Sequence, residues 1–507
     1  MPEDAYPASI PERRSVAKNA FALFASQTFT WVLATIVTTV QPRFLGPIGQ
    51  GQLRVAVALW TIITLVAAFG TTTLLTIEVA KDPLVADSLQ RRSMRIRLIS
   101  FSAVVPGVAL FLWLGHYDRG TIVISILLGA STLFALASGS YTGVLLGLRE
   151  MGKTSRIDAI NKLVFTVLLI VVLLAGGGVV GVAAVGVALA VFGLVQTRLA
   201  YSGSLPNGQR EAVLRGRSLF RLGGTFLLAD AALVVYQQVD TIVMSQLVGP
   251  KAIGWYATAD VLFGSLLFIP VLLSTALFPE MAEKFHLDPA AADALLSRTF
   301  RSLLLLAVPI GVGTIVVAKS FVSLLYGPSF AQTTDVLQIY GVVVILEFVV
   351  ILLSRFAQAT GQVRFWTIMM AIAIAATIPL DIVFVPWCER TFHNGAMGGA
   401  LSYVVTEGVI LVVACLRIAR SMLTRATMWR VLKCLVGGTA MFAVGWPLRE
   451  KFFLVSAIVS LAAYALVLWV LRTFDDDERG QIKRAKVLVR RRLPIGRQAA
   501  TESGGTA

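Results

Sequence analysis

Charged residues are scarce in this sequence: only 14% of its 507 residues are Asp, Glu, Lys or Arg, whereas 57% are hydrophobic. Soluble domains carry about a quarter charged residues, so this composition excludes a water-soluble fold. The apolar residues form continuous runs, for example over residues 303–318 and 452–471, without the polar stripe of a soluble amphipathic helix. We therefore predict an all-α, polytopic membrane protein.

Cysteine is also scarce, because the chain has only Cys388, Cys415 and Cys434, which are far apart in the sequence. This pattern fits neither a disulfide framework nor a Cys/His metal site. Two segments, residues 147–154 and 176–181, match the glycine-rich sequence patterns of nucleotide-binding loops. Both lie between apolar runs that leave no room for the β-strand which must precede such a loop. We predict no metal, no cofactor, no nucleotide and no catalytic residue, and hence no enzyme.

Apolar runs of about 20 residues, long enough to cross a bilayer, occur about fourteen times. They begin near residues 18, 52, 97, 120, 156, 178, 221, 251, 301, 332, 365, 395, 431 and 452. In this arrangement 36 of the 44 Lys and Arg residues fall on the side that holds both termini. The other side receives Arg43, Arg54, Arg119, Lys251, Lys319, Arg390, Arg449 and Lys451.

This asymmetry predicts a cell (cytoplasmic) membrane protein with both termini in the cytoplasm. The net charge of +16 is then explained by membrane orientation, so no nucleic-acid partner is expected. The tail, residues 475–507, begins with four acidic residues and continues with a basic stretch. It is predicted to be a cytoplasmic anchor, with an interfacial helix that binds anionic lipid as the alternative.

Three sequence anchors occur twice, in the same order. Gly46, Pro47 and Gly51 follow the first span, and Gly249, Pro250 and Gly254 follow the seventh. Asp82-Pro83 corresponds to Asp288-Pro289, and Gly178, Gly181 and Ala183 correspond to Gly395, Gly398 and Ala400. Ordered matches of this kind indicate a duplicated unit.

The duplication spans six helices, an even number, so the two halves are predicted to insert in the same orientation. We expect an N-terminal bundle over residues 1–217 with spans 1–6, and a C-terminal bundle over 218–425 with spans 7–12. An extra helix pair follows over 426–474. Two such bundles enclose a central path and rock against each other, which is the architecture of a transporter.

Polar and charged side chains inside the spans must face water or a partner, because burying a charge in lipid is costly. The candidates for a substrate or ion path are Asp230, Gln237, Gln238, Asp240, Asp260, Glu347, Arg355, Arg54 and Lys162. Asp230, Asp260 and Glu347 are predicted to lie near mid-depth as a cation or proton site, with interhelical hydrogen bonds as the alternative. Asp158 and Lys162 are spaced for a local ion pair.

The chain resembles the polysaccharide-export flippases, which move O-antigen, capsule or teichuronic-acid repeat units on a lipid carrier. The resemblance is carried by Leu45-Gly46-Pro47 with Gly51, by Asp240 with residues 247–256, by Phe278-Pro279, by Tyr326-Gly327-Pro328 with Phe330, and by residues 357–361. It covers about residues 15 to 470. The wider superfamily also includes the multidrug and toxin extruders and the lipid II flippases.

The resemblance implies alternating access by two six-helix bundles, a lipid-linked (undecaprenyl-diphosphate) oligosaccharide as substrate, and coupling to H+, Na+ or the membrane potential. It also implies membrane lipids and polymerase or export machinery as partners. Arg54, Lys162 and Arg355 are the candidates for contact with the diphosphate, since the deep arginines of lipid II flippases have no counterpart in the first spans. The alternatives are a cation-coupled multidrug exporter, a lipid II flippase, or an integral-membrane polysaccharide polymerase or sugar transferase.

Overall fold

The computed structural model describes residues 13–211, 216–449 and 453–473, and for residues 13–32 and most of 216–233 it describes the backbone alone. The predicted basic tail, residues 475–507, lies outside this part. The helices are α1 Arg13–Ala68, α2 Thr71–Lys81, η1 Pro83–Val85, α3 Ala86–Leu114, α4 Arg119–Gly147, α5 Met151–Leu174, α6 Gly178–Ser202, α7 Gly216–Leu247, α8 Pro250–Leu266, α9 Phe268–Leu287, α10 Pro289–Tyr326, η2 Pro328–Phe330, α11 Thr333–Ala359, α12 Val363–Phe392, α13 Ala396–Ile418, η3 Arg420–Met422, α14 Arg425–Leu448 and α15 Phe453–Val470.

The all-α membrane fold is confirmed. Eleven helical segments of the described chain are long and apolar enough to span a bilayer, and the bent pair α8–α9 is a twelfth. One segment, Leu33–Lys81, includes parts of two crossings because α1 reverses direction at Gly46, where φ is 67° and ψ is 174°. With α7 in the place of the seventh span, each predicted span corresponds to a helix or to half of α1.

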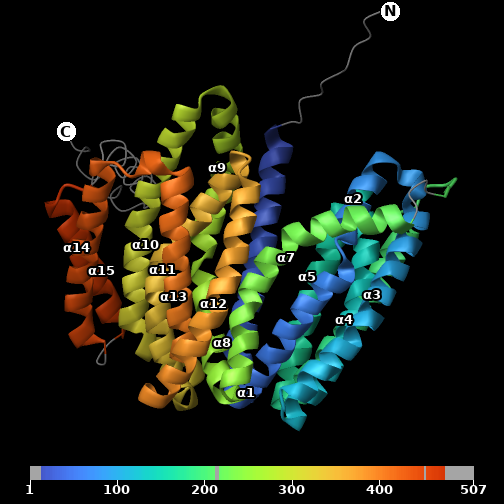
Figure 1. The fold of residues 1–507 in the computed structure, drawn as a ribbon, viewed down its shortest axis with the longest axis horizontal. Helices are drawn as coiled ribbons and strands as arrows, with labels where there is room; N and C mark the ends of the chain where they lie inside the picture. Colours follow the sequence, from blue (N-terminus) through green and yellow to red (C-terminus); the bar gives the residue numbers. More distant parts are fainter. Residues whose placement is uncertain (1–12, 212–215, 450–452, 474–507) are drawn as a thin grey trace, which may run out of the picture.

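The helices form two groups that converge at one end (Figure 1). Helices α1–α6 pack mainly with one another on one side, and α7–α13 on the other, while α14 and α15 pack together against α10. At the converging end, which we call the narrow end, α1 packs along α8. Towards the other end the groups separate. The domain boundaries at residues 217 and 425 remain a prediction.

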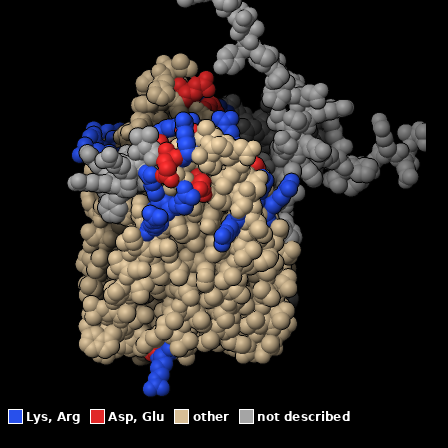
Figure 2. Space-filling model, turned by 90° about the vertical axis from the view of Figure 1, so that its right-hand side faces the viewer, with Lys and Arg blue, Asp and Glu red and all other residues tan. Residues whose placement is uncertain are grey.

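Lys and Arg side chains gather at the end opposite the narrow end, which we call the basic end, above a broad uncharged belt (Figure 2). This view agrees with the asymmetry counted in the sequence. Helices α3 and α10 extend beyond their apolar cores at this end, and Asp82 and Asp288 are the N-cap residues of η1 and α10. Residues 86–96, which precede the predicted start of the third span near residue 97, are helical as well.

The Asp-Pro anchor has the same conformation in both halves, whereas Gly46 and Gly249, with φ of 67° and −69°, differ. Asp82 and Asp288 are both extended, with φ of −143° and −152°, and each carboxylate accepts a hydrogen bond from the backbone N–H two residues later. Gly178 and Gly395 likewise lie where α6 and α13 begin. These local similarities support the predicted repeat.

The second span of each half is broken. In the first half, Phe69 and Gly70 have φ values of 48° and 63°, which separate α1 from α2. In the second half, α8 and α9 are bent by 40° at Leu267. Broken spans occur in transporters where a helix lines a substrate path, because free backbone groups are tolerated only there.

Candidate functional site

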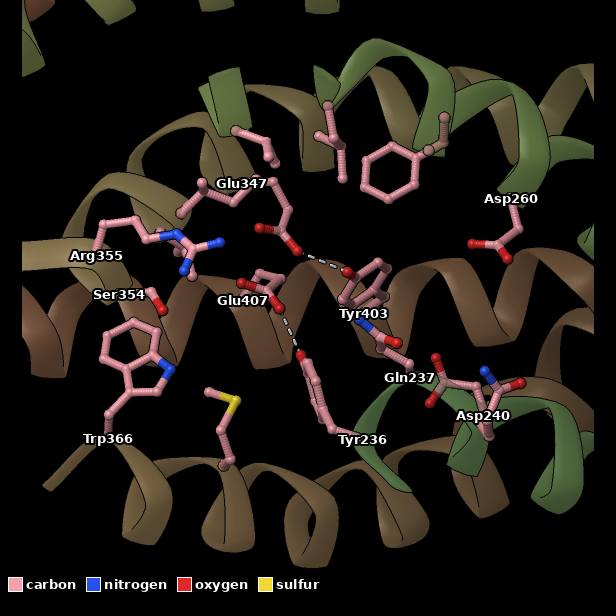
Figure 3. Close-up of a pocket in the computed structure, with 18 of the residues that line it drawn as sticks. Tyr236, Gln237, Asp240, Asp260, Glu347, Ser354, Arg355, Trp366, Tyr403 and Glu407 are labelled. Carbon is pink, nitrogen blue, oxygen red and sulfur yellow. Dashed lines mark hydrogen bonds between the residues drawn. The ribbon is translucent and has the colours of Figure 1, made fainter. Parts of the chain in front are cut away.

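A polar cavity of about 520 Å³ lies in the second group of helices, bordered by the first group at Arg54 (Figure 3). Its wall comes mostly from α7, α8, α11, α12 and α13, and Arg54 of α1 closes it from the other group. Four carboxylates and two guanidinium groups line it, together with tyrosine, tryptophan, glutamine and serine side chains. These are Asp240, Asp260, Glu347, Glu407, Arg54, Arg355, Tyr236, Tyr256, Tyr403, Trp366, Gln237, Gln238, Gln358 and Ser354.

Two tyrosines hold two of these carboxylates in place. The Tyr403 hydroxyl donates to Glu347 Oε1 at 2.7 Å, and the Tyr236 hydroxyl donates to Glu407 Oε1 at 2.5 Å (Figure 3). Glu347 is 9% exposed and Glu407 only 1%. Because an unpaired buried carboxylate is costly, these bonds fix both acids at the cavity wall.

A third pair, Arg54 with Asp260, connects the two groups of helices. Arg54 Nη2 lies 2.9 Å from Asp260 Oδ2, and Arg54 Nε donates to Thr241 Oγ1 at 3.3 Å. Tyr256 of α8 donates to Asp240 Oδ2 at 2.9 Å in the same region. This network closes the cavity on the side of the narrow end.

Below that network the backbones of α1 and α8 touch. A Cβ on Gly51 would overlap the carbonyl oxygen of Pro250, and a Cβ on Gly254 would overlap that of Pro47. The duplicated Gly-Pro segments thus pack against each other, and only glycine permits this approach. Tyr117 adds a further link by hydrogen bonding with Ser245 and Gln246 of α7.

The structure brings together most of the path residues predicted from sequence. Arg54, Gln237, Gln238, Asp240, Asp260, Glu347 and Arg355 all line the cavity. Asp230 lies on α7 outside the side chains that the structure describes. Whether these residues contact a substrate or ion remains a prediction.

Lys162 is the exception, because it lines a different hollow. The local ion pair predicted for Lys162 with Asp158 is wrong, since the two side chains make no such contact although both are described. Asp158 and Lys162 are both exposed on α5, and helical spacing alone did not bring their charged ends together.

Tyr236, Tyr403 and Trp366 were missed from the sequence as site residues. An aromatic side chain in an apolar span gives no signal of its own. Spacing could have helped for Tyr403, which lies one helical turn before Glu407 and therefore on the same face of α13. Asp381 of α12 is fully buried but does not line the cavity.

No group of three His, Cys, Asp or Glu residues that could bind a metal ion occurs in the described part of the chain. The segment over residues 147–154 is the turn between α4 and α5, with α5 beginning at Met151. The segment over residues 176–181 is likewise a turn, between α5 and α6. Neither is preceded by a strand, since the described residues are helical on both sides.

The family profile described as polysaccharide biosynthesis protein matches residues 16–285, which is more than half of the chain. A second profile, MatE, matches residues 226–383. A comparison with curated proteins finds no match.

Among solved structures, the chain is similar to the lipid II flippase MurJ in an inward closed conformation. The TM-score is 0.70 at 13% identity, with 89% of this chain and 98% of that chain covered. An inward-facing multidrug resistance MATE family transporter of the MOP superfamily gives a TM-score of 0.58 at 16% identity, covering 78% and 96%. A eukaryotic MATE transporter gives 0.51 at 15% identity, covering 81% and 97%. At these identities the likeness shows the fold alone. The chain belongs to the polysaccharide biosynthesis protein family and is a multi-pass membrane protein.

Proposed function

We propose that this protein is a flippase that carries an undecaprenyl-diphosphate-linked oligosaccharide repeat unit across the cytoplasmic membrane, for the synthesis of a surface polysaccharide. The observation that carries the proposal is the polar cavity of the second helix group, bordered by Arg54 of the first group and closed at the narrow end by Arg54, Asp260 and the glycine contact. The sugar head group would cross inside this cavity, without covalent chemistry.

The chemistry of the cavity suits a carbohydrate. Carboxylates, amides and hydroxyls can exchange hydrogen bonds with sugar hydroxyls, while Trp366 and the tyrosines offer ring faces with a polar edge. A volume of about 520 Å³ lies within the range of small-ligand sites, roughly 300–1,000 Å³. Both features support binding of one polar head group between the bundles.

The direction of transport follows from orientation. If the basic end faces the cytoplasm, as the Lys and Arg distribution predicts, the two groups separate towards the cytoplasm and meet at the outer surface. This conformation would receive a substrate from the inner leaflet. Rocking about the contact region would then open the narrow end and release the head group outside.

Coupling to H+ or Na+ is part of the proposal. The cavity carries four carboxylates against two guanidinium groups. Clustered acids within a membrane bind cations or protons when they face a wet cavity. The same acidity favours a second candidate, a cation-coupled exporter of small cationic drugs.

Deletion of the gene followed by analysis of lipid-linked sugars distinguishes these candidates. Accumulation of completed repeat units and loss of surface polysaccharide support a flippase. Unfinished units point to an enzyme, and drug sensitivity with normal polysaccharide points to a drug exporter.

The deletion strain can then be complemented with the triple variant Asp230→Asn, Asp260→Asn, Glu347→Gln. This variant should fold and reach the membrane but should not restore polysaccharide export. Normal export by that variant would remove these residues from the mechanism.

A further inference from the structure

The wall of the central cavity carries more acidic than basic side chains. Arg54 is occupied by its ion pair at the narrow end, which leaves three carboxylates opposite one guanidinium group. These are Asp240, Glu347 and Glu407 opposite Arg355. None of the four forms an ion pair within the part of the chain that the structure describes. A substrate in this cavity therefore meets an acidic surface.

Glu347 and Glu407 lie next to each other in this wall. The tyrosines that donate to them, Tyr403 and Tyr236, pack edge to face with ring centroids 6.2 Å apart. Each tyrosine has a single O–H, so it satisfies one carboxylate oxygen and leaves the second one. Figure 3 shows both carboxylates and the Arg355 guanidinium group turned towards the same part of the cavity.

Acceptor atoms without a donor are buried in the same wall. Glu407 is 1% exposed, and its Oε2 atom has no hydrogen-bond partner among the described residues. The same is true of Oε1 of Gln238, which also lines the cavity. Because a buried acceptor without a donor is costly, a ligand that supplies N–H or O–H groups here stabilises the wall.

The charges follow an order along the path. Arg355 lies four residues before Ala359, where α11 ends at the basic end. Glu347 lies eight residues deeper on the same helix, about 12 Å along its axis at 1.5 Å per residue. A head group that enters from the basic end reaches Arg355 before the glutamates. Its diphosphate, which is bonded to the first sugar, can thus stay beside Arg355 while the sugars lie against Glu347 and Glu407.

This order decides which sugars fit. An acidic sugar such as a uronic acid would bring a third carboxylate against Glu347 and Glu407 in a site of low dielectric constant, where like charges repel strongly. A neutral sugar offers hydroxyl or N–H groups that donate to the two glutamates. An amino sugar with a free ammonium group donates and also balances their charge.

We infer that Glu347 and Glu407 are specificity-determining residues that restrict the substrate to head groups without acidic sugars. The inference rests on the proposed function and deepens it by naming the class of sugar that the cavity carries, which is neutral or basic. The two glutamates select by repulsion as well as by hydrogen bonding, because they reject the wrong head group through its charge.

The test measures binding of three undecaprenyl-diphosphate-linked disaccharides to the purified full-length protein in lipid nanodiscs. The three differ only in the terminal sugar, which is glucose, glucosamine with a free amine, or glucuronic acid. Wild type should bind the glucuronic acid compound about tenfold more weakly than the glucose compound, because of like-charge repulsion. It should bind the glucosamine compound at least as tightly as the glucose compound.

Glutamine variants remove the charge and keep the carbonyl oxygen that accepts from each tyrosine, so the fold should be retained. In the double variant Glu347→Gln, Glu407→Gln, the glucuronic acid compound should bind about as tightly as the glucose compound. If that variant does not fold, each single variant should still lower the discrimination about threefold. Glu283→Gln is the matched control and should discriminate like wild type, because Glu283 is an exposed acid on α9 that does not line the cavity.

Three results would overturn the inference. The first is equal binding of the glucose and glucuronic acid compounds by wild type, or binding of none of the three compounds. The second is weaker binding of the glucosamine compound than of the glucose compound, since charge of either sign would then be rejected. The third is unchanged discrimination in the glutamine variants, which would leave the two glutamates a structural role only.

Failure here differs from failure of the proposed function. If deletion of the gene leaves surface polysaccharide normal while the double variant still loses the preference of wild type, the flippase proposal fails and the specificity assignment stands. If deletion blocks export but wild type binds the glucose and glucuronic acid compounds equally, the specificity assignment fails and the flippase proposal stands.

Discussion

Arg54 Nη2 of α1 lies 2.9 Å from Asp260 Oδ2 of α8, so one ion pair joins the two halves of the protein beside the central cavity. The side chains are 20% and 28% exposed, so water weakens the pair without removing it. Its position above the contact between Gly51 and Pro250 makes it part of the closure of the narrow end.

Breaking this pair should favour the state that is open at the narrow end. For Asp260→Asn we expect a shift of about 1 kcal/mol, roughly a fivefold change in the conformational equilibrium. The measurement is the distance distribution between spin labels at Val180 and Phe392, which lie near the narrow ends of α6 and α12, in a cysteine-free background. Glu280→Gln, which breaks the exposed pair with Lys284 inside α9, should leave the distribution unchanged.

Adding a methyl group at Gly51 or Gly254 should prevent full closure of the narrow end. In Gly51→Ala the new Cβ would overlap the Pro250 carbonyl, and the strain should cost about 1–3 kcal/mol in the free energy of unfolding. Transport should fall as well, because the closed state is part of the cycle. Gly107→Ala is the control, since nothing lies within 4 Å of a Cβ there. Wild-type transport by Gly51→Ala would show that this contact is not a gate.

The tyrosine–carboxylate pairs allow structure and function to be separated. Tyr236→Phe removes the donor to buried Glu407 and should lower the free energy of unfolding by about 1–3 kcal/mol. In the double variant Tyr236→Phe, Glu407→Met both polar partners are gone, so much of the stability should return. Transport should stay low in the double variant if Glu407 serves the path. Thermal unfolding and export assays on the same preparations decide this, and recovery of both properties would assign the pair a structural role only.

The cap at Asp82 should make stability depend on pH. Arg210 Nη2 lies 2.7 Å from Asp82 Oδ2 at the basic end, and this hydrogen bond holds the pKa of Asp82 below its ordinary value. A lowered pKa in the folded state means that the carboxylate stabilises the fold above the ordinary pKa of aspartate. That contribution disappears as the pH falls through the lowered pKa. The difference in melting temperature between wild type and Asp82→Asn should therefore shrink from pH 7 to pH 3.

Asp288→Asn serves as the comparison for that experiment, because Asp288 caps α10 with the same backbone geometry but makes no ion pair with an arginine in the described chain. A cap contributes about 1 kcal/mol. If the melting temperatures of Asp82→Asn and Asp288→Asn depend on pH in the same way, Arg210 does not contribute to the pH dependence of stability.

Features that depend on local sequence were predictable. The spans follow from runs of apolar residues, and the Gly-Pro and Asp-Pro anchors marked helix starts because their chemistry is local. The breaks at Phe69 and Leu267 were not predicted, although the sequence carries a local signal for each. Gly70 and three threonines follow Phe69, and Pro270 lacks the N–H that would bond to the carbonyl of Leu266, where α8 ends.

The site was predictable in part for the same reason. Charged residues such as Glu347 and Asp260 are conspicuous in an apolar span, so their presence in the cavity could be anticipated. Their hydrogen-bond and ion-pair partners could not be anticipated. The pairing of Arg54 with Asp260, and the position of Lys162 on the other side of α8, depend on how α1, α5 and α8 are placed in space.

Transport by the purified protein tests the central claim most directly. Proteoliposomes would be loaded with an undecaprenyl-diphosphate-linked oligosaccharide, and head groups reaching the opposite leaflet would be counted by their accessibility to a glycosidase. Wild type should transfer the lipid-linked sugar, whereas Gly51→Ala should slow transfer and Gly107→Ala should not. Transfer no faster than in protein-free vesicles would contradict the account.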